Sequence, residues 1–189
     1  MKHFRLLGWL VVVLTATGFH FAPTGIRADT LPMADLEESD LLFRVGTETV
    51  SAAIRAVSFG RWSHVGLLTN EGGQWMVIHA LPSESEGKVG GVIIEPLASF
   101  LEHAQSVSVF RNRLAEDKGT VSQRARTFLA RPFGFASSET YCTKLVIDAY
   151  ASSSAPITVS SQTFKVFGNS YEIVLPQALA DSAVLQRIF

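Results

Sequence analysis

The sequence predicts an α+β fold in which helices pack against a mostly antiparallel sheet. Strand-like segments with alternating or continuous apolar residues follow one another along the chain. Two of these segments are joined by a tight turn signal, and stretches with helical spacing flank the series. A run of short strands flanked by helices is typical of this fold class.

Most of the predicted sheet lies in the first two thirds of the chain. The expected strands cover residues 40–45, 62–69, 74–81, 91–95 and 106–111. A Glu-Gly-Gly turn signal at 71–73 joins the second and third strands into a hairpin. Residues 47–59 have apolar side chains at the spacing of one helical face, and Pro96 begins a second helix over 97–103. The polar stretch at 82–88 is expected to be a loop.

The last third of the chain is expected to carry more helix. Residues 117–130 show helical spacing, and Pro132 ends that helix. A loop at 133–138 then precedes a helix at 140–150. The remaining expectations are a Ser-rich linker at 151–155, an ambiguous stretch at 160–170, a short strand at 171–175 and a helical turn that begins at Pro176.

The first 28 of the 189 residues have the layout of a secretory signal peptide. Lys2 and Arg5 give positive charge, an apolar stretch follows at 6–14, and a polar region of small residues ends at Ala28. This apolar stretch is shorter than the ~20 residues that span a bilayer, so we favour cleavage over an uncleaved membrane anchor. We therefore expect an exported protein, periplasmic or extracellular, with a single domain over 29–189.

Composition and charge exclude several kinds of partner. The formal net charge is −1 and the isoelectric point is near 6.5, and Lys and Arg form no cluster, so we expect no nucleic-acid partner. Beyond the N-terminal segment no stretch is long and apolar enough to cross a membrane. One Cys and two His without a fourth ligand make a poor metal site, so we expect neither metal nor cofactor. The oligomeric state is left open.

Cys142, which is the only cysteine, lies at the start of the predicted helix at 140–150. Together with Leu145, Val146 and Ala149 it forms the apolar face that would pack against the sheet. At a helix start, unpaired backbone N–H groups and the helix dipole favour a thiolate and can hold an oxyanion. The position predicts a nucleophile, whereas an inert buried thiol is the alternative.

Two histidines lie in the predicted hairpin. Even positions in the strand containing His64 share one face, and so do odd positions in the strand containing His79. A turn at 71–73 places both rings on the same side of adjacent strands, within hydrogen-bonding reach. A nucleophilic thiol needs a base and a group that orients that base, so the three residues make a coherent catalytic set. Spacing alone leaves two ordinary structural histidines as an equal alternative.

Four segments resemble a known family, the circularly permuted, NlpC-type papain-like cysteine hydrolases of the YiiX/YebB-like branch. The likeness spans about residues 38–180, with the histidine strand before the cysteine helix, the reverse of ordinary papain-like enzymes. The matching segments are Asp-Leu-Leu-Phe at 40–43, Trp-Ser-His-Val-Gly at 62–66, Val-Ile-His-Ala at 77–80 and Tyr-Cys-Thr-Lys-Leu-Val at 141–146.

The resemblance implies a permuted papain-like fold, with a sheet packed against the helix that carries the cysteine. It also implies a role for each matching residue. Cys142 would be the nucleophile, His64 the general base and His79 the third, orienting residue, while Tyr141 and Thr143 would support the oxyanion site. The branch more usually has Glu where this chain has His79, and a neutral ring stabilises an imidazolium less than a carboxylate does.

The sequence and the resemblance leave three candidate functions. The first is hydrolysis of an amide bond in a peptide or in cell-wall peptide, through a thioester acyl-enzyme. The second is an acyl hydrolase or transferase acting on lipid or lipidated substrates, for which Phe133, Phe135 and Ala136 would line an acyl groove. Ordinary core aromatics are the preferred interpretation of those residues. The third is a non-catalytic binding module, against which the intact Cys and His residues argue.

Overall fold

The computed structural model describes residues 30–47, 49–83, 90–166 and 169–189. The predicted signal peptide at 1–28 lies outside the described residues, and so does most of the predicted loop at 82–88. None of the helices in the described part of the chain is long and apolar enough to cross a membrane.

A six-stranded sheet forms the centre of the described fold, in the order β4-β3-β2-β1-β5-β8. Each pair of neighbours in it is antiparallel. Its strands are β1 (Leu41–Gly46), β2 (His64–Glu71), β3 (Gln74–Leu81), β4 (Gly91–Pro96), β5 (Ala104–Asn112) and β8 (Leu185–Arg187). The predicted α+β class with a mostly antiparallel sheet is confirmed.

The β2–β3 hairpin forms where the turn signal predicts it. Gly72 and Gly73 have φ angles of 58° and 91°, a left-handed conformation that glycine adopts without strain. The side chain of Asn70 accepts a 2.8 Å hydrogen bond from the backbone N–H of Gly73 and closes the turn. This turn fixes the register of the two strands that carry His64 and His79.

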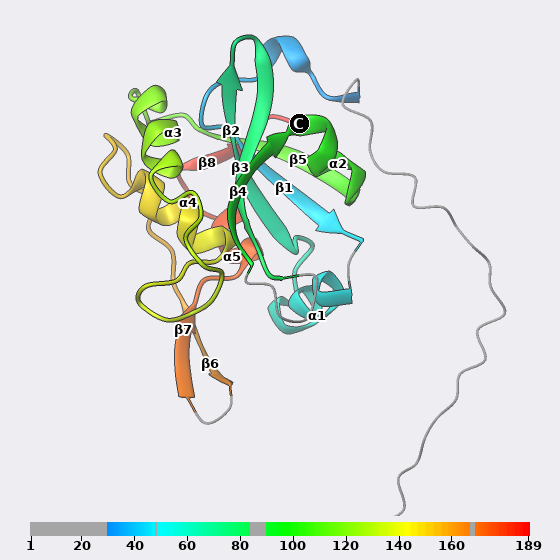
Figure 1. Cartoon of the computed structure of the whole chain (residues 1–189), viewed down its shortest axis with the longest axis vertical. Coiled ribbons are helices and arrows are strands. Elements are labelled where there is room, and N and C mark those ends of the chain that lie inside the picture. The colour runs from blue at the N-terminus through cyan, green and yellow to red at the C-terminus, as the bar shows by residue number, and fades with distance from the viewer. Residues whose placement is uncertain (1–29, 48, 84–89, 167–168) are drawn as a thin grey trace, which may run out of the picture.

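Helices flank the sheet on both sides. They are α1 (Thr49–Ser58), α2 (Leu97–Glu102), α3 (Lys118–Arg126), α4 (Cys142–Tyr150) and α5 (Pro176–Ala180), with a 3₁₀ turn at Met33–Asp35. In Figure 1, α3 and α4 lie to one side of the sheet and α2 lies to the other. The sheet is therefore covered by different helices on its two faces.

The helix predicted over 117–130 is shorter than expected, because it ends at Arg126. Ala130 has a φ of 64°, and its N–H donates a 3.0 Å hydrogen bond to the carbonyl of Val92. The N–H of Val92 in turn donates to the carbonyl of Arg131. Backbone pairing with the edge strand β4 thus replaces the last helical turn that the apolar spacing predicted.

Two apolar cores lie on the two faces of the sheet. Alternate residues of β1 and β2, such as Phe43 and Leu67, pack with Leu145 of α4 in one core. The intervening residues of the same strands, such as Leu68, pack with Phe100 of α2 in the other core. This alternation is what a sheet buried on both faces requires, and the two faces divide the residues of the site between them.

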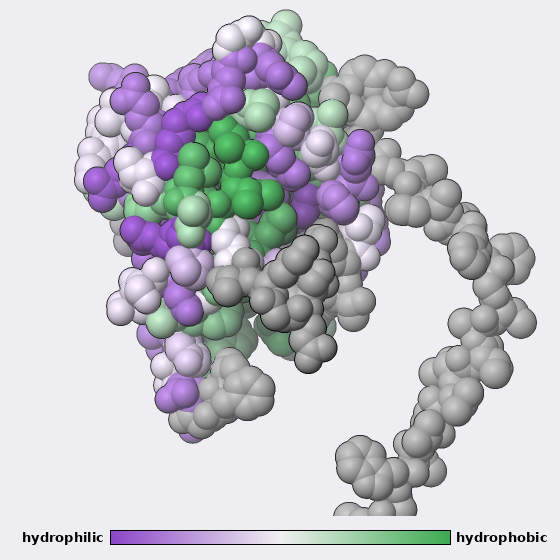
Figure 2. Space-filling model, viewed as in Figure 1, coloured by the Kyte–Doolittle hydropathy of each residue, from purple (hydrophilic) through white to green (hydrophobic). Residues whose placement is uncertain are grey.

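Strands β6 (Gln162–Val166) and β8 have no counterpart in the sequence-based expectation, whereas β7 (Asn169–Ile173) overlaps the short strand predicted at 171–175. The ambiguous stretch at 160–170 contributes to a hairpin of β6 and β7, which projects from the body of the fold in Figure 1. Strand β8 pairs with β5 at the edge of the sheet. On the side shown in Figure 2, hydrophobic side chains gather over β3 and β4 within a hydrophilic border.

Candidate active site

Cys142 is the first residue of α4, and Tyr141 precedes it with extended backbone angles. The helix packs as predicted, because Leu145, Val146 and Ala149 are buried against the sheet in the same core as Cys142. The N–H groups of the first turn have no partner within the helix and lie beside the thiol. Local sequence therefore places a sulfur atom next to several backbone donors.

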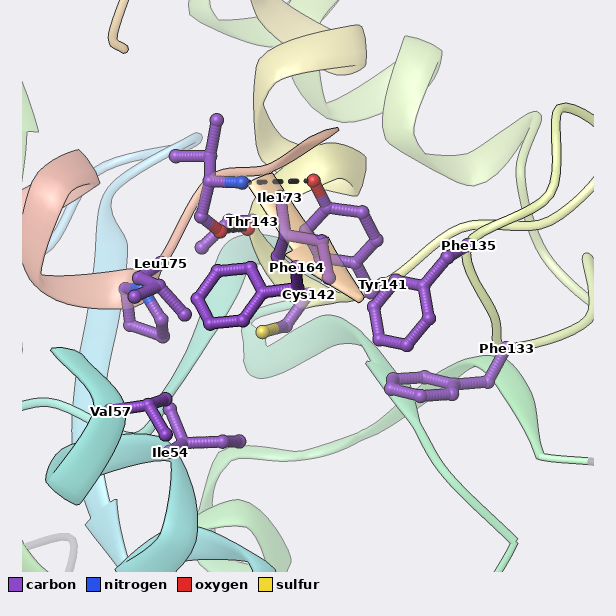
Figure 3. Close-up of a pocket in the computed structure, with 12 residues that line it drawn as sticks. Ile54, Val57, Phe133, Phe135, Tyr141, Cys142, Thr143, Phe164, Ile173 and Leu175 are labelled. Atoms are coloured by element: carbon purple, nitrogen blue, oxygen red, sulfur yellow. Dashed lines mark hydrogen bonds between the residues drawn. The ribbon is translucent and has the colours of Figure 1, made fainter. Parts of the chain in front are cut away.

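The hydroxyl groups of Tyr141 and Thr143 hold the start of α4 against the segment before α5. The Tyr141 hydroxyl accepts a 3.1 Å hydrogen bond from the N–H of Val174, and the Thr143 hydroxyl donates a 2.5 Å bond to the Val174 carbonyl. Figure 3 shows these side chains around the cysteine. Both hydroxyl groups are engaged with Val174, so the two residues anchor the helix start.

Burial dominates the titration of the thiol. It raises the pKa of Cys142 to about 11, although backbone hydrogen bonds with Val65 and Thr143 and the charge of Arg44 act in the opposite direction. The backbone donors at the helix start lower the pKa of the thiol, as expected, but by less than burial raises it. The desolvation of a buried sulfur outweighs the N–H donors, and the resting group is a neutral thiol.

The two predicted histidines contact each other on adjacent strands. A 2.9 Å hydrogen bond joins His64 Nε2 and His79 Nδ1, and both rings are buried. Both rings also lie against Phe100 of α2, with centroid separations of 5.8 Å and 5.1 Å. The predicted pairing across the hairpin is present, and Phe100 fixes the plane in which the pair lies.

The histidines and the cysteine approach from opposite faces of the sheet. His64 and His79 face α2, whereas Cys142 belongs to the core on the α4 face. Cys142 and His64 both line a cavity of about 500 Å³, whereas His79 does not line it. Ser63 and Phe133 also line this cavity, which is a size usual for small-ligand sites.

Burial also keeps the imidazole of His64 neutral. Its pKa lies well below the ordinary value, first because the ring is desolvated and then because the charge of Arg44 opposes a further positive charge. A neutral imidazole can accept a proton. Thiol and ring are thus both uncharged at rest, which is the arrangement from which a general base acts.

Two charged residues of the site were not predicted from the sequence. Oε1 of Glu95 lies 2.9 Å from His79 Nε2, on the far side of the ring from His64. Arg44 is buried, donates a 2.7 Å hydrogen bond to the Phe100 carbonyl and lies over the Phe100 ring. Arg44 in β1 and Glu95 in β4 are each the single charged residue of a strand without other charges. A lone charge in such a strand is the sequence signal that indicates these two residues.

A second, mostly apolar cavity of about 240 Å³ adjoins the sulfur. Phe133 and Phe135 line both cavities. Phe133 also packs against the core, as its interpretation as a core aromatic predicts, whereas Phe135 is 39% exposed. Ala136, the third residue predicted for such a groove, does not line either one. Figure 3 shows the sulfur of Cys142 among the aromatic and aliphatic side chains contributed by α1, by the loop before α4 and by the β6–β7 region.

The described residues contain no cluster of three or more His, Cys, Asp or Glu side chains that could hold a metal ion. Lys144, which follows the cysteine by two residues, pairs with Asp148 along α4. Its ammonium group is therefore engaged on the helix surface, and it is absent from the groups that shift the pKa of the thiol.

Comparison with known proteins identifies the family. The model of the permuted papain-like amidase enzymes YaeF/YiiX, family C92, matches residues 35–189. The crystal structure of the metalloprotein YiiX from Escherichia coli O157:H7 is similar in fold, with 20% identity and a TM-score of 0.67 over 81% of this chain and 96% of that chain. Curated proteins gave no significant match. The cysteine helix follows the histidine strands and the family model covers most of the sequence, so the chain belongs to the permuted papain-like cysteine amidases of the YaeF/YiiX family.

Proposed function

We propose that this protein is an exported amidase that cleaves a peptide amide, including those of cell-wall peptides, with Cys142 as nucleophile and His64 as general base. The observation that carries the proposal is the shared cavity, which is lined both by the thiol at the start of α4 and by His64, whose Nε2 is bonded to His79. The family supports amide hydrolysis, while the residue roles, the peptide substrate and the export are our inference.

The proposed reaction starts from the neutral pair. The thiol of Cys142 gives its proton to Nδ1 of His64, since Nε2 is bonded to His79, and the sulfur attacks the carbonyl carbon. Backbone N–H groups at the start of α4 donate to the oxyanion that forms. His64 then protonates the leaving amine, and a thioester remains on the sulfur.

Water completes the cycle. His64 takes a proton from the water that attacks the thioester, the carboxylic acid leaves and the thiol is restored. Tyr141 and Thr143 serve this step indirectly, because their hydrogen bonds to Val174 keep the first turn of α4 in place. A displaced helix start would misplace the sulfur and the oxyanion donors together.

The apolar cavity supports a second candidate, hydrolysis or transfer of an acyl group from a lipidated substrate. Phe133, Phe135 and Ile54 line that cavity at the sulfur, and an acyl chain would bury apolar surface there. Comparing peptide amides with acyl esters of increasing chain length separates the two. A rate that rises with chain length favours the acyl candidate, and a rate that depends on the peptide favours the amidase.

The test of the catalytic assignment uses the single thiol. We expect the wild-type enzyme to form an acyl-enzyme that intact-mass spectrometry detects and hydroxylamine removes, as it does with a thioester. Cys142→Ala should abolish both the adduct and turnover. Turnover that survives this substitution would refute the assignment. The mass of the mature protein tests export, with cleavage after Ala28 as the expected result.

A further inference from the structure

Glu95 has no part in the reaction proposed above, although it contacts one of its residues. We propose that Glu95 is a positioning residue that acts through His79 and fixes the proton arrangement of both rings, so that His64 presents an unprotonated Nδ1 to the thiol. The inference rests on the proposed function, because it assigns a further residue to the same proton transfer.

The proton arrangement follows from the contacts one ring at a time. An ionised carboxylate only accepts hydrogen bonds, so the nitrogen 2.9 Å from Glu95, His79 Nε2, carries the proton. A neutral imidazole has one N–H, which leaves His79 Nδ1 as an acceptor. The 2.9 Å bond between the rings then requires a proton on His64 Nε2. His64 Nδ1 is therefore free of hydrogen and able to accept one.

Without the carboxylate the opposite arrangement becomes available. His79 could carry its proton on Nδ1 and donate to His64 Nε2, and the single proton of His64 would then occupy Nδ1. A ring in that state offers an N–H to the thiol and cannot accept its proton. The loss of an orienting carboxylate that leaves a catalytic histidine in the wrong tautomer is a large effect in hydrolases.

The pairing of β3 with β4 places Glu95 next to His79. In that register His79 lies opposite Ile93, and Glu95 lies opposite Val77, so the carboxylate reaches the ring diagonally. His79 is fully buried, whereas 20% of the Glu95 side chain is exposed. Solvent therefore reaches Glu95 at the edge strand, whereas His79 in the middle of this series of contacts is shielded from it.

The charges around Glu95 keep it ionised. Burial alone would raise its pKa, but the hydrogen bond from the N–H of His79 and the positive charge of Arg44 outweigh burial, and the pKa lies below the ordinary value. Arg44 on β1 and the titratable ring of His103, which follows α2, face the carboxylate from elements other than its own strand. Glu95 is therefore an anion at neutral pH.

The same contacts act when the proton moves. His64 becomes an imidazolium, whose Nε2–H continues to donate to His79 Nδ1. The Glu95 carboxylate polarises His79 and makes Nδ1 a better acceptor, which lowers the energy of the charged ring. The proton stops at His64 and Glu95 stays ionised. This supplies, one residue farther out, the carboxylate that the family more usually has at the third position.

The first test substitutes Glu95 with Gln, which keeps an acceptor oxygen and removes the charge, and with Leu, which removes both. We expect kcat to fall about 10- to 100-fold for Gln, with KM little changed, and farther for Leu. The matched control is Glu71→Gln on β2, whose partner Arg126 lies away from the site, and its kcat should equal that of the wild type. Glu95→Asp restores the charge and should recover part of the loss.

The pH profile distinguishes positioning from a merely structural role. Removing the carboxylate should lower the pKa of His64 further, so the acid limb of kcat/KM moves to lower pH in Glu95→Gln. A variant that simply loosened the site would admit water and move the limb toward the ordinary value of His. A limb that moves upward, or a Gln variant with wild-type kcat, would overturn the proposal.

A double-mutant cycle tests that Glu95 acts through His79. In a His79→Ala background, Glu95→Gln should cause no further loss, because the ring that transmits its effect is gone. Equal losses in both backgrounds would overturn the inference. If Cys142→Ala retains turnover, the proposed function itself fails. If that variant is inactive while Glu95→Gln behaves like the wild type, only the present inference fails.

Discussion

The two faces of the sheet surround the reacting atoms with opposite kinds of environment. On the α4 face, the thiol of Cys142 lies in an apolar core and beside an apolar cavity. On the α2 face, His64 belongs to a series of polar contacts that continues through His79 to Glu95, with Arg44 alongside. Burial raises the pKa of Cys142 and keeps the thiol neutral, whereas burial and the charge of Arg44 together lower the pKa of His64 and keep the ring neutral.

This difference shows how the site avoids holding a buried ion pair at rest. An ion pair at the sulfur would bear the desolvation cost of two charges in the absence of substrate. Here the charged residues Glu95 and Arg44 lie outside the reacting pair, because Glu95 contacts His79 and Arg44 bonds the Phe100 carbonyl. The charge separation is then confined to the moment of proton transfer.

The largest expected effect comes from removing the imidazole ring of His64, the proposed general base. His64→Ala should lower kcat/KM by about 10²- to 10⁴-fold, the usual contribution of a positioned general base. Steady-state kinetics with a peptide amide measures it, with thermal melting to verify the fold. Gln74→Ala, an exposed position on the neighbouring strand β3, is the control and should be unaffected. A loss below tenfold would show that another group accepts the thiol proton.

A smaller effect is expected when a carboxylate is placed at position 79, next to His64. His79→Glu places a second carboxylate beside Glu95, and the two would share a proton, as closely spaced carboxylates do. We expect this variant to lose about tenfold or more in kcat. The double variant His79→Glu with Glu95→Gln leaves one carboxylate directly behind His64 and should regain activity. Rescue is measured as the ratio of kcat in the two variants, and a double variant no better than the single one contradicts the model.

The smallest effects concern pH. Turnover needs one proton shared by Cys142 and His64, so kcat/KM should be bell-shaped, with an acid limb below the ordinary His value of about 6.5 and an alkaline limb near the thiol pKa of about 11. The depressed pKa of His64 means that the unfolded chain binds more protons in the acid range. The free energy of unfolding should therefore fall as pH drops below about 6.5, with no loss from this residue above it.

Urea unfolding at pH 7 and pH 5 measures that decrease, and His64→Gln should reduce it. An acid limb at or above 6.5 would show that the ring is not desolvated as described.

Much of this arrangement could be predicted because it depends on local pattern. The alternation in two strands and the turn at 71–73 predicted the contact between His64 and His79, and helical spacing predicted the buried face of α4. The pairing of Glu95 with His79 depends on a strand register set across a long connection, which local pattern does not encode. The pKa of Cys142 depends on how deeply distant segments bury the sulfur. The position of the residue at a helix start does not predict that burial.

The raised pKa of the thiol has a consequence for chemical durability. Peroxide and alkylating reagents attack the thiolate, and a thiol of pKa about 11 is ionised in only about one molecule in 10,000 at pH 7. The nucleophile is thus largely inert toward small oxidants until a substrate reaches the cavity and His64 takes its proton. A catalyst with a single cysteine and no spare thiol to resolve an oxidised one is preserved between turnovers by the same burial that makes its ionisation difficult.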